Sequence, residues 1–215
     1  MDKNKHLVVS SILFTIVLFI WPVFMALFMP QGDIEEQFRW ILENLAVSKL
    51  QFFFAFLISP ALIYLMYVQL EFYPTDRKFG RQLGFSFLTA YLVLNSIAYA
   101  SQMIVLPGML KSGSYEQAQI WYMGSKTSVI YFFNQMGYCF WAIGTIILFA
   151  NLIKESGMIR YLSIIYTISA ILSVVAFAGL IVESKILNSM TIVSGMALIP
   201  VGILSVIWGR KNMNS

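Results

Sequence analysis

Long apolar stretches without a single charged residue dominate the sequence. Each of the six reaches the roughly 20 residues that a helix needs to cross a lipid bilayer. They cover residues 7–32, 50–70, 82–110, 127–153, 161–182 and 186–209. The pattern predicts an all-α polytopic membrane protein, a bundle of six transmembrane helices that forms a single domain over residues 1–215. The expected spans are about 7–29, 50–70, 83–106, 128–150, 161–182 and 189–209.

The first apolar run could in principle be a cleaved signal peptide. Such a signal has an apolar core of roughly 7 to 15 residues, followed by a cleavage site of small residues. The run from Leu7 to Met29 is longer and leads into Pro30. We therefore expect a retained membrane span.

Three prolines interrupt the predicted spans: Pro22, Pro60 and Pro200. A proline frees a backbone carbonyl and bends its helix, so each of them could mark a hinge or the wall of a cavity. An ordinary packing kink is the more frequent outcome, since proline is common in membrane helices.

Two loops are long enough to hold structure of their own. In the first, Asp33 and Glu36 have capping-box spacing, and an apolar face begins at Ile34 and Phe38. We expect a short amphipathic helix on the outer surface, with Trp40 near the lipid headgroups. The second loop, 111–126, could form another interfacial helix that anchors the bundle, or a lid over it.

Polar side chains form one stripe on the third span and another on the fourth. The stripes are spaced so that their members share one helix face: Tyr91, Asn95, Tyr99 and Gln102 on the third span, and Tyr131, Asn134, Gln135 and Tyr138 on the fourth. An unpartnered amide in hydrocarbon costs several kcal/mol, so both stripes should turn away from lipid. We expect a polar cluster between these two spans, in the outer half of the membrane.

This predicted cluster has two interpretations. It could be an outward-facing pocket for a neutral or amphipathic small molecule, with amides and phenols as hydrogen-bonding groups. It could also be a set of interhelical hydrogen bonds, each worth roughly 0.6 to 2 kcal/mol, that hold two spans together. The second interpretation is favoured, because ion and proton pathways usually need a charged residue deep in a span and none is present.

Composition agrees with a membrane protein and gives an orientation. Hydrophobic residues make up 59% of the chain and charged residues 11%, which excludes a soluble globular protein. The net charge of +4 reflects topology rather than affinity for nucleic acid. With the N-terminus inside, nine Lys and Arg residues lie on the inner side and five on the outer side. This bias predicts that both termini are cytoplasmic.

Cysteine and histidine usage restricts the chemistry. Cys139 is the only cysteine and His6 the only histidine, so a disulfide within the chain and a histidine-based metal cluster are excluded. No acid or base in the apolar cores could activate Ser96, Thr145 or Ser173. We expect no enzymatic activity, no catalytic residue, no bound metal and no cofactor.

Small residues and charges add two local expectations. Gly137 and Gly144 in the fourth span, and Ser169 and Ser173 in the fifth, should let helices pack closely. Gln69 precedes Glu71 and a basic cluster of Arg77, Lys78 and Arg81, which resembles a cytoplasmic loop in contact with anionic lipid.

Sequence features distributed over the chain resemble a known family. They are the basic loop 73–78, the aromatic fourth span around 132–138, the loop 152–162 and a last span that closes on residues 207–211. This layout is similar to a widespread bacterial family of six-span inner-membrane proteins, a domain of unknown function. The resemblance implies the fold class and a bacterial plasma membrane, and it implies no substrate and no catalytic residue.

The sequence thus predicts a multi-pass protein that binds, senses or assists other components within the membrane, without catalysis. Its partners should be the lipid bilayer and either a small amphipathic or neutral ligand or another membrane protein, and not nucleic acid. The alternative is a small-molecule transporter or channel that uses the polar cluster between the third and fourth spans. A polar path connecting the two sides of the membrane would favour that alternative.

Overall fold

Six helical spans lie side by side in the computed structural model, which describes residues 2–73 and 78–213 except for the side chain of Asn212. Each is long and apolar enough to cross a membrane. The spans are α1 (Lys3–Phe28), α3 (Leu45–Leu70), α4 (Lys78–Met103) continued by α5 (Val105–Lys111), α7 (Val129–Phe149) followed by the 3₁₀ turn η1 (Ala150–Lys154), α8 (Met158–Ile181), and the successive helices α9 (Lys185–Asn188), α10 (Met190–Ala197) and α11 (Ile199–Met213). The predicted all-α, six-span class is confirmed.

Several helices extend beyond the charge-free runs. α3 begins at Leu45 instead of near residue 50 and includes Lys49, and α4 begins at Lys78 instead of near residue 83. Long charged side chains near a helix end can reach interfacial water while their stems remain on the helix. The length of a charge-free run therefore underestimates the length of these helices.

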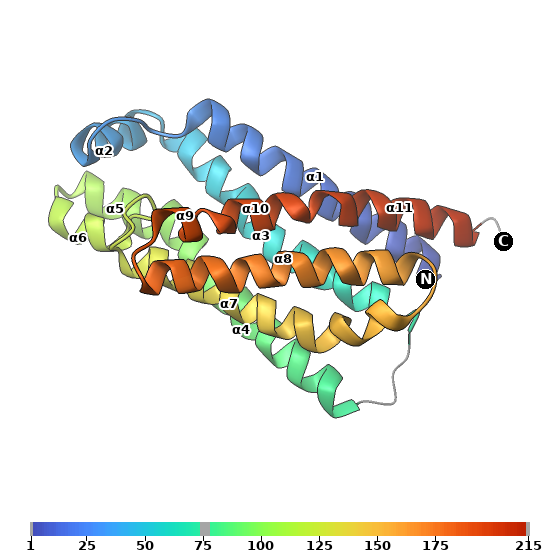
Figure 1. Ribbon diagram of the computed structural model, residues 1–215. Coiled ribbons are helices and arrows are strands. Elements are labelled where there is room, and N and C mark those ends of the chain that lie inside the picture. The colour runs from blue at the N-terminus through green and yellow to red at the C-terminus, as the bar shows by residue number, and fades with distance from the viewer. Residues whose placement is uncertain (1, 74–77, 214–215) are drawn as a thin grey trace.

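The spans form a closed ring in chain order (Figure 1). α1 packs on α3, α3 on α4, α4 on α7 and α7 on α8, while α8 contacts both α10 and α11, and α11 returns to α1. Both termini lie at one end of the ring, here named the terminal end. The short helices α2 (Ile34–Glu43), α5 and α6 (Tyr115–Trp121) lie at the opposite end, here named the cap end.

Small residues set the closest contacts between helices, as predicted. A Cβ atom on Gly144 of α7 would lie only 2.8 Å from the backbone oxygen of Gly84 in α4, so a larger residue cannot fit without moving the helices. Ser169 and Ser173 of α8 both hydrogen-bond to the hydroxyl of Ser194 in α10, at 3.0 and 2.7 Å. Glycine and serine thus join neighbouring spans inside the molecule.

The three span prolines have different effects. Pro22 and Pro60 lie inside the continuous helices α1 and α3. The last span is interrupted at Leu198, two residues before Pro200, and the chain continues as a separate helix, α11. A proline at the start of α11 is tolerated because the first turn of a helix does not need its N–H.

The terminal end contains a fully buried hydrogen-bond network centred on Gln69. Its amide nitrogen donates to Ser205 Oγ at 2.7 Å, and its oxygen accepts from the Tyr166 hydroxyl at 2.9 Å. These contacts join α3, α11 and α8. The expectation that Gln69 belongs to a cytoplasmic loop was wrong, because α3 continues to Leu70 and places this residue inside the ring. Arg77 lies outside the described residues.

The amphipathic helix predicted in the first loop is confirmed as α2, and Asp33 and Glu36 form its capping box. Its apolar face does not lie open to lipid, however. Phe38 and Ile41 are buried in a small core of their own with residues of α5, α6 and Tyr122. The expected surface helix is therefore part of a folded cap, and so is the second loop, which contains α6.

Candidate functional site

Four of the predicted polar residues meet between α4 and α7. The hydroxyl oxygens of Tyr99 and Tyr138 are 2.8 Å apart and share a hydrogen bond. The rings of Tyr91 and Tyr138 pack with their centroids 5.9 Å apart. Asn95 lies beside both of these tyrosines and directly over Gly137. The stripe on α4 therefore faces α7, as its spacing indicates.

Gln102, at the cap end of the same stripe, has a different partner. It is fully buried, its amide nitrogen donates to the backbone oxygen of Trp121 at 2.5 Å, and its oxygen accepts from the backbone N–H of Met123 at 3.0 Å. Gln102 thus holds both sides of Tyr122 in the loop that links α6 to α7.

The remaining residues of the fourth span turn toward the last span. The Tyr131 hydroxyl donates to Asn188 Oδ1, and Gln135 Oε1 accepts a hydrogen bond of 2.9 Å from the Thr191 hydroxyl. Asn134 is nearly buried, and its Oδ1 has no hydrogen-bond partner among the described residues. The predicted residues therefore divide into separate groups, because α7 lies between α4 on one side and α8 to α10 on the other.

A cavity of about 200 Å³ lies beside the central tyrosines. Trp21 and Pro22 of α1 form one side, Tyr91 and Tyr138 another, and Gly195 of α10 a third. Most of its surface is apolar, and none of the described residues that line it is charged. Pro22 therefore does form a cavity wall, the less frequent of the two roles expected for a proline in a membrane helix.

Two tryptophans among the lining residues have buried indole N–H groups. Trp141 is only 1% exposed, and the indole N–H groups of Trp141 and Trp21 have no hydrogen-bond partner among the described residues. A buried donor without a partner costs about 1 to 3 kcal/mol.

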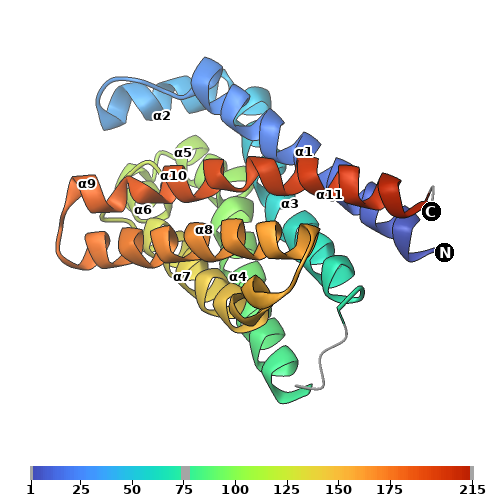
Figure 2. The ribbon, with the colours of Figure 1, turned by 45° about the vertical axis from the view of Figure 1, so that its right-hand side comes forward.

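The cavity lies where two spans separate. Near the terminal end, α11 packs closely on α1, where a Cβ atom on Gly209 would lie 2.7 Å from Val8. Toward the cap end, α1 diverges from α10 in both views (Figures 1 and 2). Ile192 and Met196 line the cavity on the α10 side and are 70% and 51% exposed. The opening between α1 and α10 therefore faces the side of the bundle, where lipid would lie.

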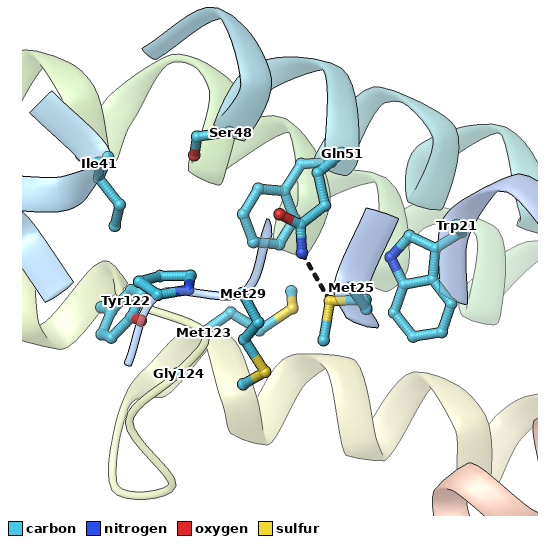
Figure 3. A pocket seen from close by; sticks show the side chains of 11 residues that line it. Trp21, Met25, Met29, Ile41, Ser48, Gln51, Tyr122, Met123 and Gly124 are labelled. Carbon is cyan, nitrogen blue, oxygen red and sulfur yellow. Dashed lines mark hydrogen bonds between the residues drawn. The ribbon is translucent and has the colours of Figure 1, made fainter. Parts of the chain in front are cut away.

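A second pocket of about 90 Å³ lies between this cavity and the cap (Figure 3). Trp21 and Met25 line both spaces, so the two spaces are adjacent at these side chains. The loop residues Tyr122 and Met123 close the second pocket at the cap end. We name the first space the lateral cavity and the second the outer pocket.

Several of these residues are not indicated by polar patterns in the sequence. Trp21 and Trp141 stand in apolar runs, where an aromatic side chain usually belongs to the core. In the last span, Pro200 was the feature that indicated a break in the helix or a cavity wall. The fold brings α1 and α10 together at the cavity, and no sequence spacing links them.

This architecture was compared with known families, proteins and structures. No family model, no curated protein and no solved structure matches the chain. Fold and site define a six-span helical bundle of the membrane-protein type with a laterally open apolar cavity.

Proposed function

We propose that this is a non-enzymatic binding protein of the membrane, and that its site is the lateral cavity. The observation that carries the proposal is an uncharged apolar space of about 200 Å³, with Ile192 and Met196 of its lining exposed on the lipid-facing side of the bundle. Ligand sites in proteins are typically apolar cavities with a few placed polar groups. The ligand would be a neutral, largely apolar molecule taken from the bilayer, and its binding could serve sensing or an accessory role.

Side chains that fill the ring below the cavity favour binding over transport. Leu65, Met66 and Tyr166 are fully buried toward the terminal end. In this conformation they separate the lateral cavity from that end of the molecule. One feature supports transport as a second candidate: the last span is interrupted beside the cavity, and discontinuous helices line the substrate sites of many transporters.

Photolabelling tests the proposed site. A long-chain probe without charge, with a photoreactive diazirine at the end of its chain, should label segment 190–198 and α1 in nanodiscs. Gly195→Leu should reduce this labelling, because a Cβ atom at Gly195 meets no atom within 4 Å and the added side chain can occupy the cavity. Gly108→Leu is the matched control, since its Cβ also meets no atom within 4 Å but lies in α5, away from the cavity. Equal labelling of all three proteins would refute the site.

The orientation remains a prediction with its own test. We infer a bacterial plasma membrane with cytoplasmic termini from the nine-to-five distribution of basic residues and from the family resemblance. In a Cys139→Ala background, Ser114→Cys at the cap end should react with a membrane-impermeant thiol reagent added from outside. Ser156→Cys near the terminal end should react only from inside. The opposite pattern would reverse the orientation and place the cap in the cytoplasm.

A further inference from the structure

The outer pocket differs from the lateral cavity in the polar groups at its wall. Ser48 and Gln51, both on α3, are only 2% and 3% exposed. The Ser48 hydroxyl and the Gln51 side-chain oxygen point toward the space enclosed by Met29, Met123 and Tyr122 (Figure 3). The Gln51 amide nitrogen is already engaged, at 2.6 Å from the sulfur of Met25. A molecule in the outer pocket would therefore meet one hydroxyl and one amide oxygen.

The closing loop of the outer pocket is fixed from two sides. Gln102 holds the backbone on both sides of Tyr122, and the Tyr122 hydroxyl donates to Gln37 of α2 at 2.6 Å. A side chain at Gly124 would collide with the Tyr122 ring, so this glycine lets the ring fold back over the loop. The pocket is thus a preformed space with a defined end, which limits how far a bound molecule can extend toward the cap.

From this arrangement we infer that the ligand is an uncharged single-chain amphiphile. Its polar head lies in the outer pocket against Ser48 and Gln51, and its chain passes Trp21 and Met25 into the lateral cavity. A hydroxyl head fits these groups, because it donates to the Gln51 oxygen and accepts from the Ser48 hydroxyl. This inference rests on the proposed function, since it assumes that the lateral cavity holds a ligand.

The charge of the walls decides between classes of head group. None of the described residues that line the outer pocket or the lateral cavity carries a charge. A buried phosphate, carboxylate or ammonium group without a counter-charge would lose its hydration and gain no ion pair. The walls therefore favour a long-chain alcohol over a fatty acid, a long-chain amine or a phospholipid of similar chain length.

Three probes with the same chain and a terminal diazirine test this inference: a primary alcohol, a carboxylate and an ammonium. We expect the alcohol to label segment 190–198 most strongly in nanodiscs. Gln51→Leu should weaken labelling by the alcohol about five- to tenfold, the effect of losing one buried hydrogen bond. It should not weaken labelling by the corresponding alkane. Ser48→Ala gives a second, smaller substitution at the same pocket, and thermal unfolding of both variants checks that the fold is intact.

A second set of alcohol probes, with the diazirine next to the head group, tests the direction of binding. These should label the outer pocket at Met29 or Met123 and not segment 190–198. The reversed pattern, or equal labelling by alcohol, carboxylate and ammonium, would overturn the inference while leaving the lateral cavity as a binding site. Absence of cavity labelling by every probe, the alkane included, would overturn the proposed function itself.

Discussion

The Gln69 network and the lateral cavity differ in how their buried polar groups are paired. At the terminal end, Gln69 uses its oxygen and its nitrogen to join Tyr166 and Ser205, and close glycine contacts draw α1 and α11 together. Toward the cap end, α1 leaves α10, and Trp21 and Trp141 keep indole N–H groups without partners. The paired groups around Gln69 join three helices, whereas the tryptophans that line the lateral cavity keep buried donors without partners among the described residues.

This difference assigns separate tasks to the two halves. A satisfied, densely packed polar network contributes to stability and to a unique arrangement of helices. An apolar cavity lined by residues with unpaired buried donors lowers stability, and on the proposed function it is the space that a ligand fills. Substitutions should therefore affect mainly folding at the terminal end and mainly binding around the lateral cavity.

The largest effect on stability is expected for Gln69→Leu. The change leaves the hydroxyl groups of Tyr166 and Ser205 without their shared partner inside the ring, although Ser205 can still donate to the backbone oxygen of Val201. We expect the free energy of unfolding to fall by about 2 to 3 kcal/mol, measured by denaturant unfolding in detergent micelles.

A double variant distinguishes the network from a simple packing change. Adding Tyr166→Phe to Gln69→Leu removes the stranded hydroxyl and should recover part of the lost stability. If Gln69→Leu unfolds at the same denaturant concentration as the unmodified protein, the network does not hold the terminal end together.

A pair of glycine substitutions compares the two halves directly. Gly144→Ala places a methyl group 2.8 Å from the backbone oxygen of Gly84, and α4 and α7 must move apart. We expect a loss of about 1 to 3 kcal/mol from this overpacking. Gly195→Ala beside the lateral cavity meets no atom within 4 Å and should not destabilise the protein. Thermal unfolding of both variants is the measurement. Equal melting temperatures would show that packing at Gly144 and at Gly195 is equally tolerant of a methyl group.

The sequence predicts the helices better than it predicts their partners. Charge-free length and hydropathy define each span, and the capping box defines α2, because these signals are local. Polar spacing also places Tyr91, Asn95 and Tyr99 on one face of α4, since spacing follows from helix geometry. Which neighbouring helix a face meets depends on the order of the spans around the ring, and no local pattern contains that information.

Gln69 and Gln135 are two residues whose partners the local sequence does not predict. Gln69 stands near Glu71 and a basic loop, so its surroundings in sequence suggest water, yet the last turn of α3 carries it into the ring. Gln135 was expected to pair with the third span, but α7 presents it to Thr191 of α10. Pro22 was the one hint of the lateral cavity, whose position could not be predicted, since a cavity is the space left when two particular helices diverge.

Gln135→Leu should have a smaller effect on stability than Gln69→Leu or Gly144→Ala. Its oxygen loses the hydrogen bond from Thr191, but the Thr191 hydroxyl can still donate to the backbone oxygen of Asn188 at 3.1 Å. We expect a loss of about 0.6 kcal/mol, the mean value for hydrogen bonds between membrane helices. An unchanged melting temperature together with altered probe labelling would indicate that Gln135 takes part in ligand binding and not in holding the helices together.

A similarly small effect near neutral pH concerns the cap, where burial raises the pKa of Tyr122 to about 12. In the unfolded chain this phenol ionises near pH 10. The folded state therefore gains stability from Tyr122 that is complete below pH 10 and is lost as the pH rises through 12.

Tyr122→Phe removes the hydrogen bond to Gln37 and should cost about 0.5 to 1 kcal/mol at pH 8. The same variant should lose less stability than the unmodified protein between pH 10 and 12, which thermal unfolding at pH 8 and pH 11.5 can measure. If both proteins lose stability equally over that range, the Tyr122 phenol is already ionised in the folded cap, and the closing loop of the outer pocket is open to water.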